Sequence, residues 1–312
     1  MVNQETDYYA HPMFHVSKVE LNTLAMEMLK NNLTEILWND GTGGLLHGAA
    51  RVGKTESLRI LSRHLETRGG VPIPNHYLLV PPRDKGTVMS ILRNICFSLD
   101  LREASRDRAD HLADRIVHYF ADTAEEAGCN DILYIVDEFQ RLRLSQLEVF
   151  VELQDKCLLL GVNLIVLFVG CEPECWEIVE AIERPENSHI RGRLFMEGIE
   201  MKGLTTHKEV NYCLSQIDGL HYPADGPSYA EFFTHKRWKI SALSHDIWGI
   251  YKEDFKRTYH IDSWPMKYFM RTLKLLLTDF IPKYGIEECG DDMIRSAIKH
   301  SRLVPSLTRK VH

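Results

Sequence analysis

Residues 48–55 read Gly-Ala-Ala-Arg-Val-Gly-Lys-Thr and fit the phosphate-binding pattern G-x-x-x-x-G-K-[ST] at every fixed position. A short apolar run, Leu45-Leu46, precedes this segment, and Leu58, Leu61 and Leu65 follow it at the spacing of one helical face. A strand, a glycine loop and a helix are the context that the pattern requires. The segment therefore predicts a site for a nucleoside triphosphate.

The chemistry of the loop assigns a role to each of its parts. Glycine lets the backbone turn so that successive N–H groups point inward, and the following helix adds the positive end of its dipole. Lys54 is expected to pair with the β and γ phosphates of ATP, and the hydroxyl of Thr55 to ligate Mg²⁺. The residues expected to bind the nucleotide are Gly48, Ala49, Ala50, Arg51, Val52, Gly53, Lys54 and Thr55.

A second segment supplies the acids that such a site needs. Residues 131–138 read Asp-Ile-Leu-Tyr-Ile-Val-Asp-Glu, an apolar run typical of a buried parallel strand. Asp137 is expected to hold the Mg²⁺ shell, and Glu138 to orient or deprotonate the attacking water. The pair of acids favours ATP hydrolysis over phosphoryl transfer to a substrate. A chance glycine loop and a strand ending in solvated acids are the alternatives, and finding both segments in one chain argues against them.

Composition limits the classes of protein that fit. The chain has 312 residues, 44% of them hydrophobic, and could form one large domain or two smaller ones. No stretch approaches the ~18–20 apolar residues of a membrane span. The first seven residues are polar and acidic, unlike a secretory signal, and the seven cysteines are scattered. We therefore expect a cytoplasmic, reduced protein with no membrane partner.

The order of apolar patterns predicts an α/β domain followed by helices. Strands are expected at 77–80, 131–137 and 162–169, and helices at 86–99, 108–127 and 146–160. Beyond residue 203, Thr206 and Glu209 form a capping-box pattern that starts a helix, and no strand-like run recurs. We predict an N-terminal tail and helix over 1–40, a parallel-sheet nucleotide domain over 41–203, and an all-helical lid and C-terminal segment over 204–312.

The order of these motifs resembles that of the AAA+ ATPases. The stretch Phe168-Val-Gly-Cys-Glu-Pro-Glu174, followed by Arg184 and by Ile190-Arg-Gly-Arg-Leu-Phe195, is similar to the TnsC/TniB group of transposition regulators. The resemblance covers roughly residues 30–260. It implies a P-loop AAA+ parallel sheet with flanking helices and a helical lid.

The resemblance also implies roles for three residues outside the loop. Cys171 stands where the group often has a small polar residue that senses the γ phosphate, and because S–H is a weak donor we expect slow, regulated hydrolysis. Arg193 aligns with the arginine finger, and Arg191 is the second candidate. A finger supplied to a neighbouring subunit implies a ring or filament that is held together by ATP. The alternative for both arginines is a surface ion pair.

In such assemblies DNA lies along the inner rim, between the second strand and the strand with the acids. The cations expected to contact double-stranded DNA, without reading its sequence, are Arg83, Lys85, Arg102, Arg106 and Arg108. The net charge of −7 argues against a protein that is basic all over, but a local basic stripe is compatible with it. Because Glu103, Asp107 and Asp110 interleave with these cations, an ordinary solvated face is the alternative.

These expectations combine into one function and one main alternative. The first is an ATP-dependent, DNA-binding, oligomeric regulator of transposition that marks target DNA and recruits a transposase. Its target-selection factor could be the guide-RNA complex of a CRISPR-associated transposon or a protein adaptor. The basic C-terminal run, with Arg295, Lys299, Arg302, Arg309 and Lys310, is either a docking tail or a mobile terminus.

The alternative function for the whole chain is an AAA+ or signalling ATPase that acts as a nucleotide-switched protein scaffold without DNA. A small-molecule kinase fits the acid pair and the helical second part less well.

Overall fold

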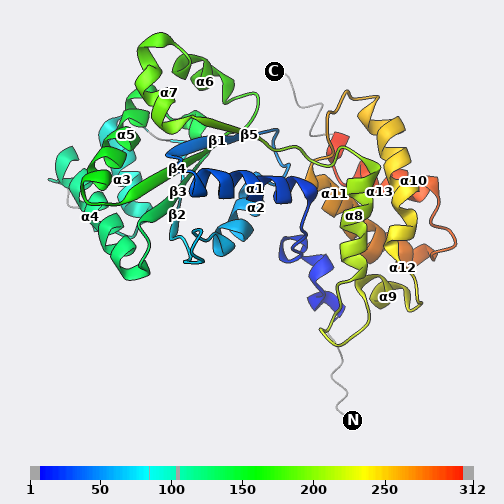
Figure 1. Cartoon of the computed structure of the whole chain (residues 1–312). Helices are drawn as coiled ribbons and strands as arrows, with labels where there is room; N and C mark the ends of the chain where they lie inside the picture. The colour runs from blue at the N-terminus through cyan, green and yellow to red at the C-terminus, as the bar shows by residue number, and fades with distance from the viewer. Residues whose placement is uncertain (1–7, 84, 103–105, 305–312) are drawn as a thin grey trace. The chain divides into compact units, whose positions relative to one another are not determined.

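The computed structural model of the chain describes residues 8–83, 85–102 and 106–304 (Figure 1). Residues 1–7, whose sequence is polar, and the basic residues Arg309 and Lys310 lie outside these ranges. The chain divides into two compact units. One consists of residues 28–50 and 54–201, and the other of the residues up to 27, residues 51–53 and the residues from 202 onward. The predicted N-terminal segment 1–40 is thus shared between the two units.

The first unit is built on a five-stranded parallel sheet with the strand order β2-β3-β4-β1-β5. This sheet confirms the predicted α/β class. The edge strand β5 was not predicted, since it is only four residues long and buries a single side chain. The strands are β1 (Gly43–His47), β2 (Asn75–Leu79), β3 (Asp131–Asp137), β4 (Asn163–Val169) and β5 (Glu197–Glu200).

Helices cover both faces of this sheet (Figure 1). One face carries α1 (Leu24–Trp38) and α2 (Lys54–Leu61), and the other carries α3 (Val88–Ser98), α4 (Ala109–Ala127) and α5 (Leu144–Leu159). Two short helices, α6 (Trp176–Ile182) and α7 (Ser188–Leu194), follow β4. Helix α1 begins at Leu24, where the hydroxyl of Thr23 accepts a hydrogen bond from the backbone N–H of Met26 (3.0 Å).

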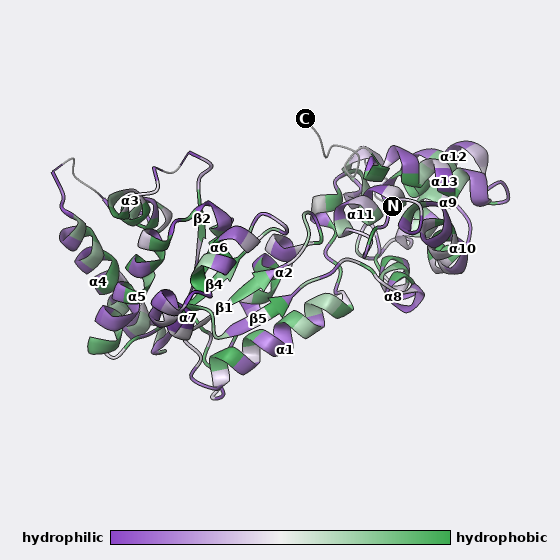
Figure 2. Cartoon of the chain, turned by 90° about the horizontal axis from the view of Figure 1, so that it is seen from above, coloured by the Kyte–Doolittle hydropathy of each residue, from purple (hydrophilic) through white to green (hydrophobic). Residues whose placement is uncertain are grey.

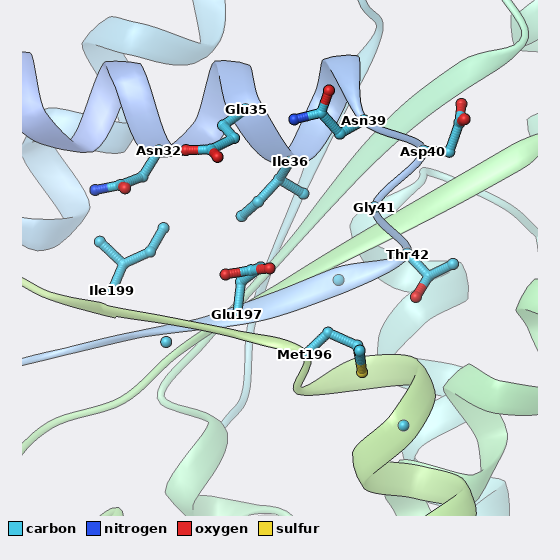
Figure 3. A pocket seen from close by; sticks show the side chains of 13 residues that line it. Asn32, Glu35, Ile36, Asn39, Asp40, Gly41, Thr42, Met196, Glu197 and Ile199 are labelled. Atoms are coloured by element: carbon cyan, nitrogen blue, oxygen red, sulfur yellow. The ribbon is translucent and has the colours of Figure 1, made fainter.

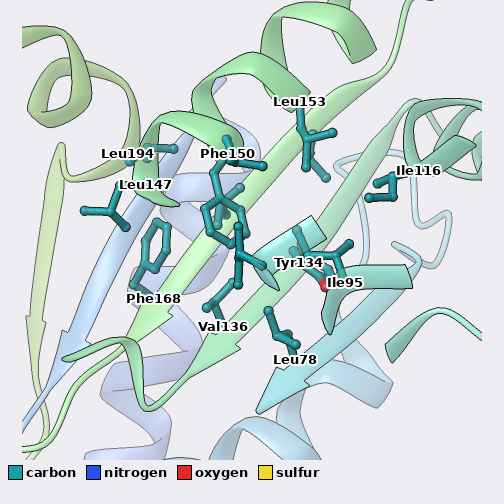
Figure 4. Close-up of a cluster of buried hydrophobic side chains, with 14 of the residues drawn as sticks. Leu78, Ile95, Ile116, Tyr134, Val136, Leu147, Phe150, Leu153, Phe168 and Leu194 are labelled. Atoms are coloured by element: carbon teal, nitrogen blue, oxygen red, sulfur yellow. The ribbon is translucent and has the colours of Figure 1, made fainter. Parts of the chain in front are cut away.

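The apolar core of this unit lies between the sheet and helices α3, α4 and α5 (Figure 4). Tyr134 and Val136 of β3 and Phe168 of β4 point into it, and Phe150 of α5 packs edge-on against Phe168 at 5.3 Å between ring centroids. Each such side chain contributes about 1.5–3 kcal/mol when it is fully buried. In Figure 2, β4 is largely green, whereas helices such as α1 carry both green and purple residues.

Strand alternation decides which side chains of β3 face the helix that follows the glycine loop. Tyr134 and Val136 belong to the core on one face, so Ile135 and Asp137 point to the opposite face. On β2, Leu78 belongs to the same core, which places Tyr77 on the face of Asp137. This face carries α2, and the candidate site described below forms on it.

The second unit is rich in helices, as predicted. Its α-helices are α8 (His207–Asp218), α9 (Tyr229–Thr234), α10 (Ser244–Ile250), α11 (Met266–Leu275), α12 (Ile281–Tyr284) and α13 (Asp291–His300), and π-helical turns continue α10 and α11. The predicted capping box of Thr206 and Glu209 starts α8. Tyr251 stacks on Trp264 with a centroid distance of 4.1 Å, and both rings are buried. Arg295, from the basic C-terminal run, pairs with Asp254 and Asp292.

A buried histidine connects the N-terminal turns to this helical core. His11 is fully buried and lies 4.4–4.6 Å, ring to ring, from Tyr229, Phe232 and Phe233. Its Nδ1 accepts a hydrogen bond from the backbone N–H of Met13 (3.1 Å). Burial lowers the pKa of His11 to about 4, because the aromatic surroundings disfavour the charged ring.

The helical unit should lose stability as the pH falls from about 6.5 towards 4. In this window the unfolded chain binds a proton at His11 and the folded chain does not, so the cost at pH 5 is about 2 kcal/mol for this group. Replacement by leucine, His11→Leu, should remove this part of the pH dependence. Urea unfolding at pH 7.5 and pH 5, followed by tryptophan fluorescence, measures it. The exposed His15, changed to Gln, is the control, and an unchanged pH dependence in His11→Leu contradicts the assignment.

Candidate nucleotide-binding site

The glycine loop leaves the sheet at the end of β1 and leads directly into α2. Gly48 has a φ of +153°, and a Cβ at this position would lie 2.2 Å from the backbone oxygen of Met201. Gly53 has a φ of +117°, which also requires glycine. Steric constraints therefore explain both fixed glycines of the motif, independently of any ligand.

Lys54 is buried within the loop that precedes it. Its Nζ donates hydrogen bonds to the backbone oxygens of Gly48 (2.6 Å) and Ala49 (2.9 Å). Burial lowers the pKa of Lys54, and the nearby carboxylates of Asp137 and Glu172 partly oppose that shift. A buried ammonium group held by neutral carbonyl oxygens is suited to receive an anion, and a phosphate oxygen fits this requirement.

Asp137 and Thr55 meet on the same face of the sheet, as the motif requires. The Thr55 hydroxyl donates a hydrogen bond of 2.8 Å to Oδ2 of Asp137. The other carboxylate oxygen, Oδ1, accepts a hydrogen bond of 2.8 Å from the backbone N–H of Glu138. A hydroxyl beside a carboxylate is a set of hard oxygen donors, and this chemistry fits Mg²⁺ together with phosphate oxygens.

Glu138 follows Asp137 in a left-handed backbone conformation, with a φ of +61°. Its carboxylate accepts hydrogen bonds from Gln140 (2.9 Å) and pairs with Arg141 (3.0 Å). Arg141 also donates to the backbone oxygen of Val80 (2.6 Å), the residue that follows β2. Both partners engage the same carboxylate oxygen, Oε2, and hold the orientation of the group.

Cys171 lies just beyond β4 and close to the same group of residues. Its backbone N–H donates to Oε1 of Gln140 (3.3 Å), so that Gln140 bridges Cys171 and Glu138. Burial raises the pKa of the Cys171 thiol to about 11, although the Lys54 ammonium group lowers it in part. The thiol is therefore neutral and can offer a phosphate only a weak S–H donor.

The two candidate finger arginines lie on α7, away from the loop of their own chain. Arg193 pairs with Asp155 on α5, and Arg191 pairs with Glu183 (3.1 Å). The hydroxyl of Thr42, at the start of β1, donates to the backbone oxygen of Arg193 (2.5 Å). The glycine loop follows the other end of β1, about 16 Å away at ~3.3 Å per strand residue. The structure therefore does not bring either arginine to Lys54 of the same chain.

The five cations predicted to contact DNA are all exposed. Arg83 and Lys85 lie in the connection between β2 and α3, and Arg102, Arg106 and Arg108 lie in the connection between α3 and α4. The latter connection also contains Asp107, which pairs with Arg115 of α4 (3.0 Å). Glu103, which belongs to the interleaved acids, lies outside the described residues.

Several residues around the site were not found by sequence reasoning. Tyr77 of β2 donates to Asp137, and Gln140 and Arg141 hold Glu138. The only sequence signal for them is their proximity to the ends of two strands. Strand register, which is a tertiary property, decides which of them meet.

Within the second unit, which includes residues 51–53, Arg51 lies near other cations. The Arg51 guanidinium lies 5.5 Å from the centroid of the Tyr268 ring, and its backbone oxygen accepts from the N–H of Lys267 (3.3 Å). Burial lowers the pKa of Lys267, and the charges of Arg271 and Arg51 lower it further. No motif in the sequence points to Lys267 or Arg271, since both are far from the loop along the chain.

A separate hollow of 350 Å³ lies at the end of β1 opposite the glycine loop (Figure 3). Glu35 and Ile36 of α1, Asp40, Met196 and Glu197 contribute to its lining. It adjoins α7 through Gly192. None of the residues expected to bind phosphate or metal lines this hollow.

The sheet order and the loop between β1 and α2 define a P-loop domain whose acids lie at the end of β3, the strand between β2 and β4. Residues 39–179 match the family described as the AAA domain. The chain thus contains an AAA-type P-loop ATPase domain. None of the curated proteins matches the sequence significantly.

Three solved structures are similar to this chain at low sequence identity, and one of them has a TM-score above 0.5. The ORC2 protein of Aeropyrum pernix, solved in ADPNP and ADP complexes, has a TM-score of 0.63 and 14% identity over 94% of this chain and 72% of that chain. A Walker-type ATPase of Pyrococcus abyssi has a TM-score of 0.42 and 17% identity over 75% of this chain and 70% of that chain. Cdc6p of Pyrobaculum aerophilum has a TM-score of 0.42 and 16% identity over 90% and 69%. The likeness to ORC2 confirms the predicted AAA+ fold. The finer resemblance to the TnsC/TniB group stays a prediction.

Two further findings concern the described residues alone. None of their helices combines the length and apolarity that crossing a membrane requires. Within the same ranges, no three His, Cys, Asp or Glu side chains gather to hold a metal ion.

The clash at Gly48 gives a direct test of the loop geometry. Gly48→Ala should lower the free energy of unfolding by about 1–3 kcal/mol, because the new Cβ has to displace the backbone at Met201. Gly198→Ala on β5 is the matched control, since no atom lies within 4 Å of a Cβ there. Chemical denaturation of both variants measures the difference. Equal stability of the two variants is incompatible with the loop described here.

Proposed function

We propose that this protein is an ATP-dependent, DNA-binding, oligomeric AAA+ regulator of transposition. The observation that carries the ATPase part is the hydrogen bond between Thr55 and Asp137, with Lys54 buried in the same loop. Lys54 would neutralise the β and γ phosphates, and Thr55 and Asp137 would hold Mg²⁺. The metal would supply charge neutralisation at the phosphate oxygens.

Glu138 is proposed as the residue that orients or deprotonates the attacking water. Gln140 and Arg141 both hold Oε2 of this carboxylate, and the positive charge of Arg141 would make it a weaker base, which supports slow and regulated hydrolysis. Cys171 would sense the γ phosphate only weakly, because its neutral thiol is a poor donor.

Arg193 is proposed to act on the nucleotide of a neighbouring subunit, with Arg191 as the second candidate. Its position beside the start of β1, away from its own loop, supports this assignment. Because Arg193 pairs with the exposed Asp155, breaking that pair costs only about 0–1 kcal/mol. ATP would then link subunits into a ring or filament.

The exposed cations in the two loops around α3 are proposed to contact the phosphates of double-stranded DNA. Repeating Arg83, Lys85, Arg102, Arg106 and Arg108 in each subunit would follow a duplex without reading its sequence. By the resemblance to the TnsC/TniB group, the assembly would mark target DNA, respond to a target-selection factor and recruit a transposase. A cytoplasmic location is part of the same proposal.

A nucleotide-switched protein scaffold without DNA is the second candidate. The observation that favours it is the ion pair between Asp107 and Arg115, which gives the loop before α4 the character of an ordinary solvated surface. The net charge of −7 points in the same direction. Both candidates share the ATP site and differ in the presence of DNA.

ATP-dependent assembly tests the ATP site and the finger together. Lys54→Ala should abolish assembly with ATP and duplex DNA, because the phosphate contact is lost. Glu138→Gln and Arg193→Ala should each lower the hydrolysis rate at least about 100-fold. Removing one group that stabilises the transition state of a reaction typically lowers the rate by about this factor. Glu138→Gln should also hold the assembly together. Electron microscopy and a phosphate-release assay measure the two effects. A wild-type protein that stays monomeric with ATP and DNA at low salt contradicts the proposal.

DNA contact is tested by the salt dependence of binding. The double variant Arg83→Ala/Lys85→Ala should bind duplex DNA more weakly, and its plot of log affinity against log salt should be less steep by about 2 per subunit. The variant Arg237→Ala/Lys239→Ala removes the same charge from exposed positions in the other unit and is the control. If both variants behave alike while ATP-dependent assembly persists, the scaffold function replaces the DNA function.

A further inference from the structure

The edge strand β2 places a tyrosine at the metal-binding acid. Tyr77 pairs in register with Ile135 of β3, and Asp137 lies two residues further along β3 on the same face. The Tyr77 hydroxyl donates a hydrogen bond to Oδ2 of Asp137.

This bond changes the number of acceptor sites that Asp137 has left. Oδ2 accepts from both Tyr77 and Thr55, and Oδ1 accepts from the backbone N–H of Glu138. An ionised carboxylate has about four acceptor sites, two on each oxygen. Oδ2 is therefore saturated, and one site on Oδ1 stays available.

The Tyr77 hydroxyl can act only as a neutral donor. A phenol is neutral near pH 7, and its hydroxyl donates a single hydrogen bond, here to Asp137. The ring is partly exposed, but its hydroxyl is bonded to Oδ2 of Asp137, the same atom that accepts from Thr55. Tyr77 thus restrains the carboxylate without adding charge to the site.

We infer that Tyr77 is a positioning residue for the metal centre. Its hydroxyl holds Oδ2 of Asp137, so that only Oδ1 can receive a metal ion or a metal-bound water. This inference rests on the proposed binding of ATP with Mg²⁺. Residues that orient metal ligands typically affect metal affinity about 10- to 100-fold when they are removed.

A tyrosine that merely attaches β2 to the sheet would behave differently. It would contribute to the stability of the fold and to nucleotide affinity equally, with and without the metal. The metal dependence of binding therefore separates the two roles.

The test measures the affinity for a fluorescent, slowly hydrolysed ATP analogue over a series of MgCl₂ concentrations and in EDTA. Tyr77→Phe should need about tenfold more Mg²⁺ for half-maximal enhancement of binding, with unchanged affinity in EDTA. Tyr134→Phe is the matched control, since it removes a hydroxyl on the neighbouring strand that bonds to Ser98 (2.9 Å), away from the site. It should keep the Mg²⁺ requirement of the wild type.

The possible outcomes are distinct. A wild-type protein that binds the analogue equally with and without Mg²⁺ overturns both the proposed function and the role of Tyr77. If the wild type depends on Mg²⁺ and Tyr77→Phe shows the same dependence, the role of Tyr77 is overturned and the proposed function stands. Loss of affinity in EDTA, or unfolding of Tyr77→Phe, assigns the residue a structural role and also overturns the inference.

Discussion

The hydrogen bond between Thr55 and Asp137 is the contact on which the candidate site depends. It joins the first turn of α2 to the end of β3, two elements separated along the chain by β2, α3 and α4. A parallel sheet brings the carboxyl ends of its strands to one edge, and the loop after β1 begins at that edge. Lys54, Thr55 and Asp137 meet there as a consequence of strand order and strand direction.

The two acids at this edge are held in different ways. Asp137 accepts hydrogen bonds from neutral groups, so its charge remains available to a cation. Glu138 instead pairs with the positive charge of Arg141. A carboxylate with neutral partners suits a fixed ligand role. A nearby cation stabilises the ionised form of a carboxylate, so the pair with Arg141 makes Glu138 a weaker base.

The site is incomplete within a single chain if an arginine is needed for hydrolysis. Arg193 lies beside the amino end of β1, whereas Lys54 follows the carboxyl end of the same strand. The length of β1 separates the two positions, and no side chain spans that distance. An assembly in which one subunit completes the site of the next resolves this separation, and the exposed ion pair of Arg193 with Asp155 would be inexpensive to exchange.

The sequence by itself determined the glycine loop, the acid-terminated strand and the α/β class, because each is encoded by short-range spacing or periodicity. The edge strand β5 escaped prediction, since four residues with one buried side chain carry no period. Only the tertiary structure decided that Tyr77 reaches Asp137 and that Arg141 joins Glu138 to the end of β2. These contacts depend on strand register, and register follows from the packing of a whole sheet face and not from any local pattern.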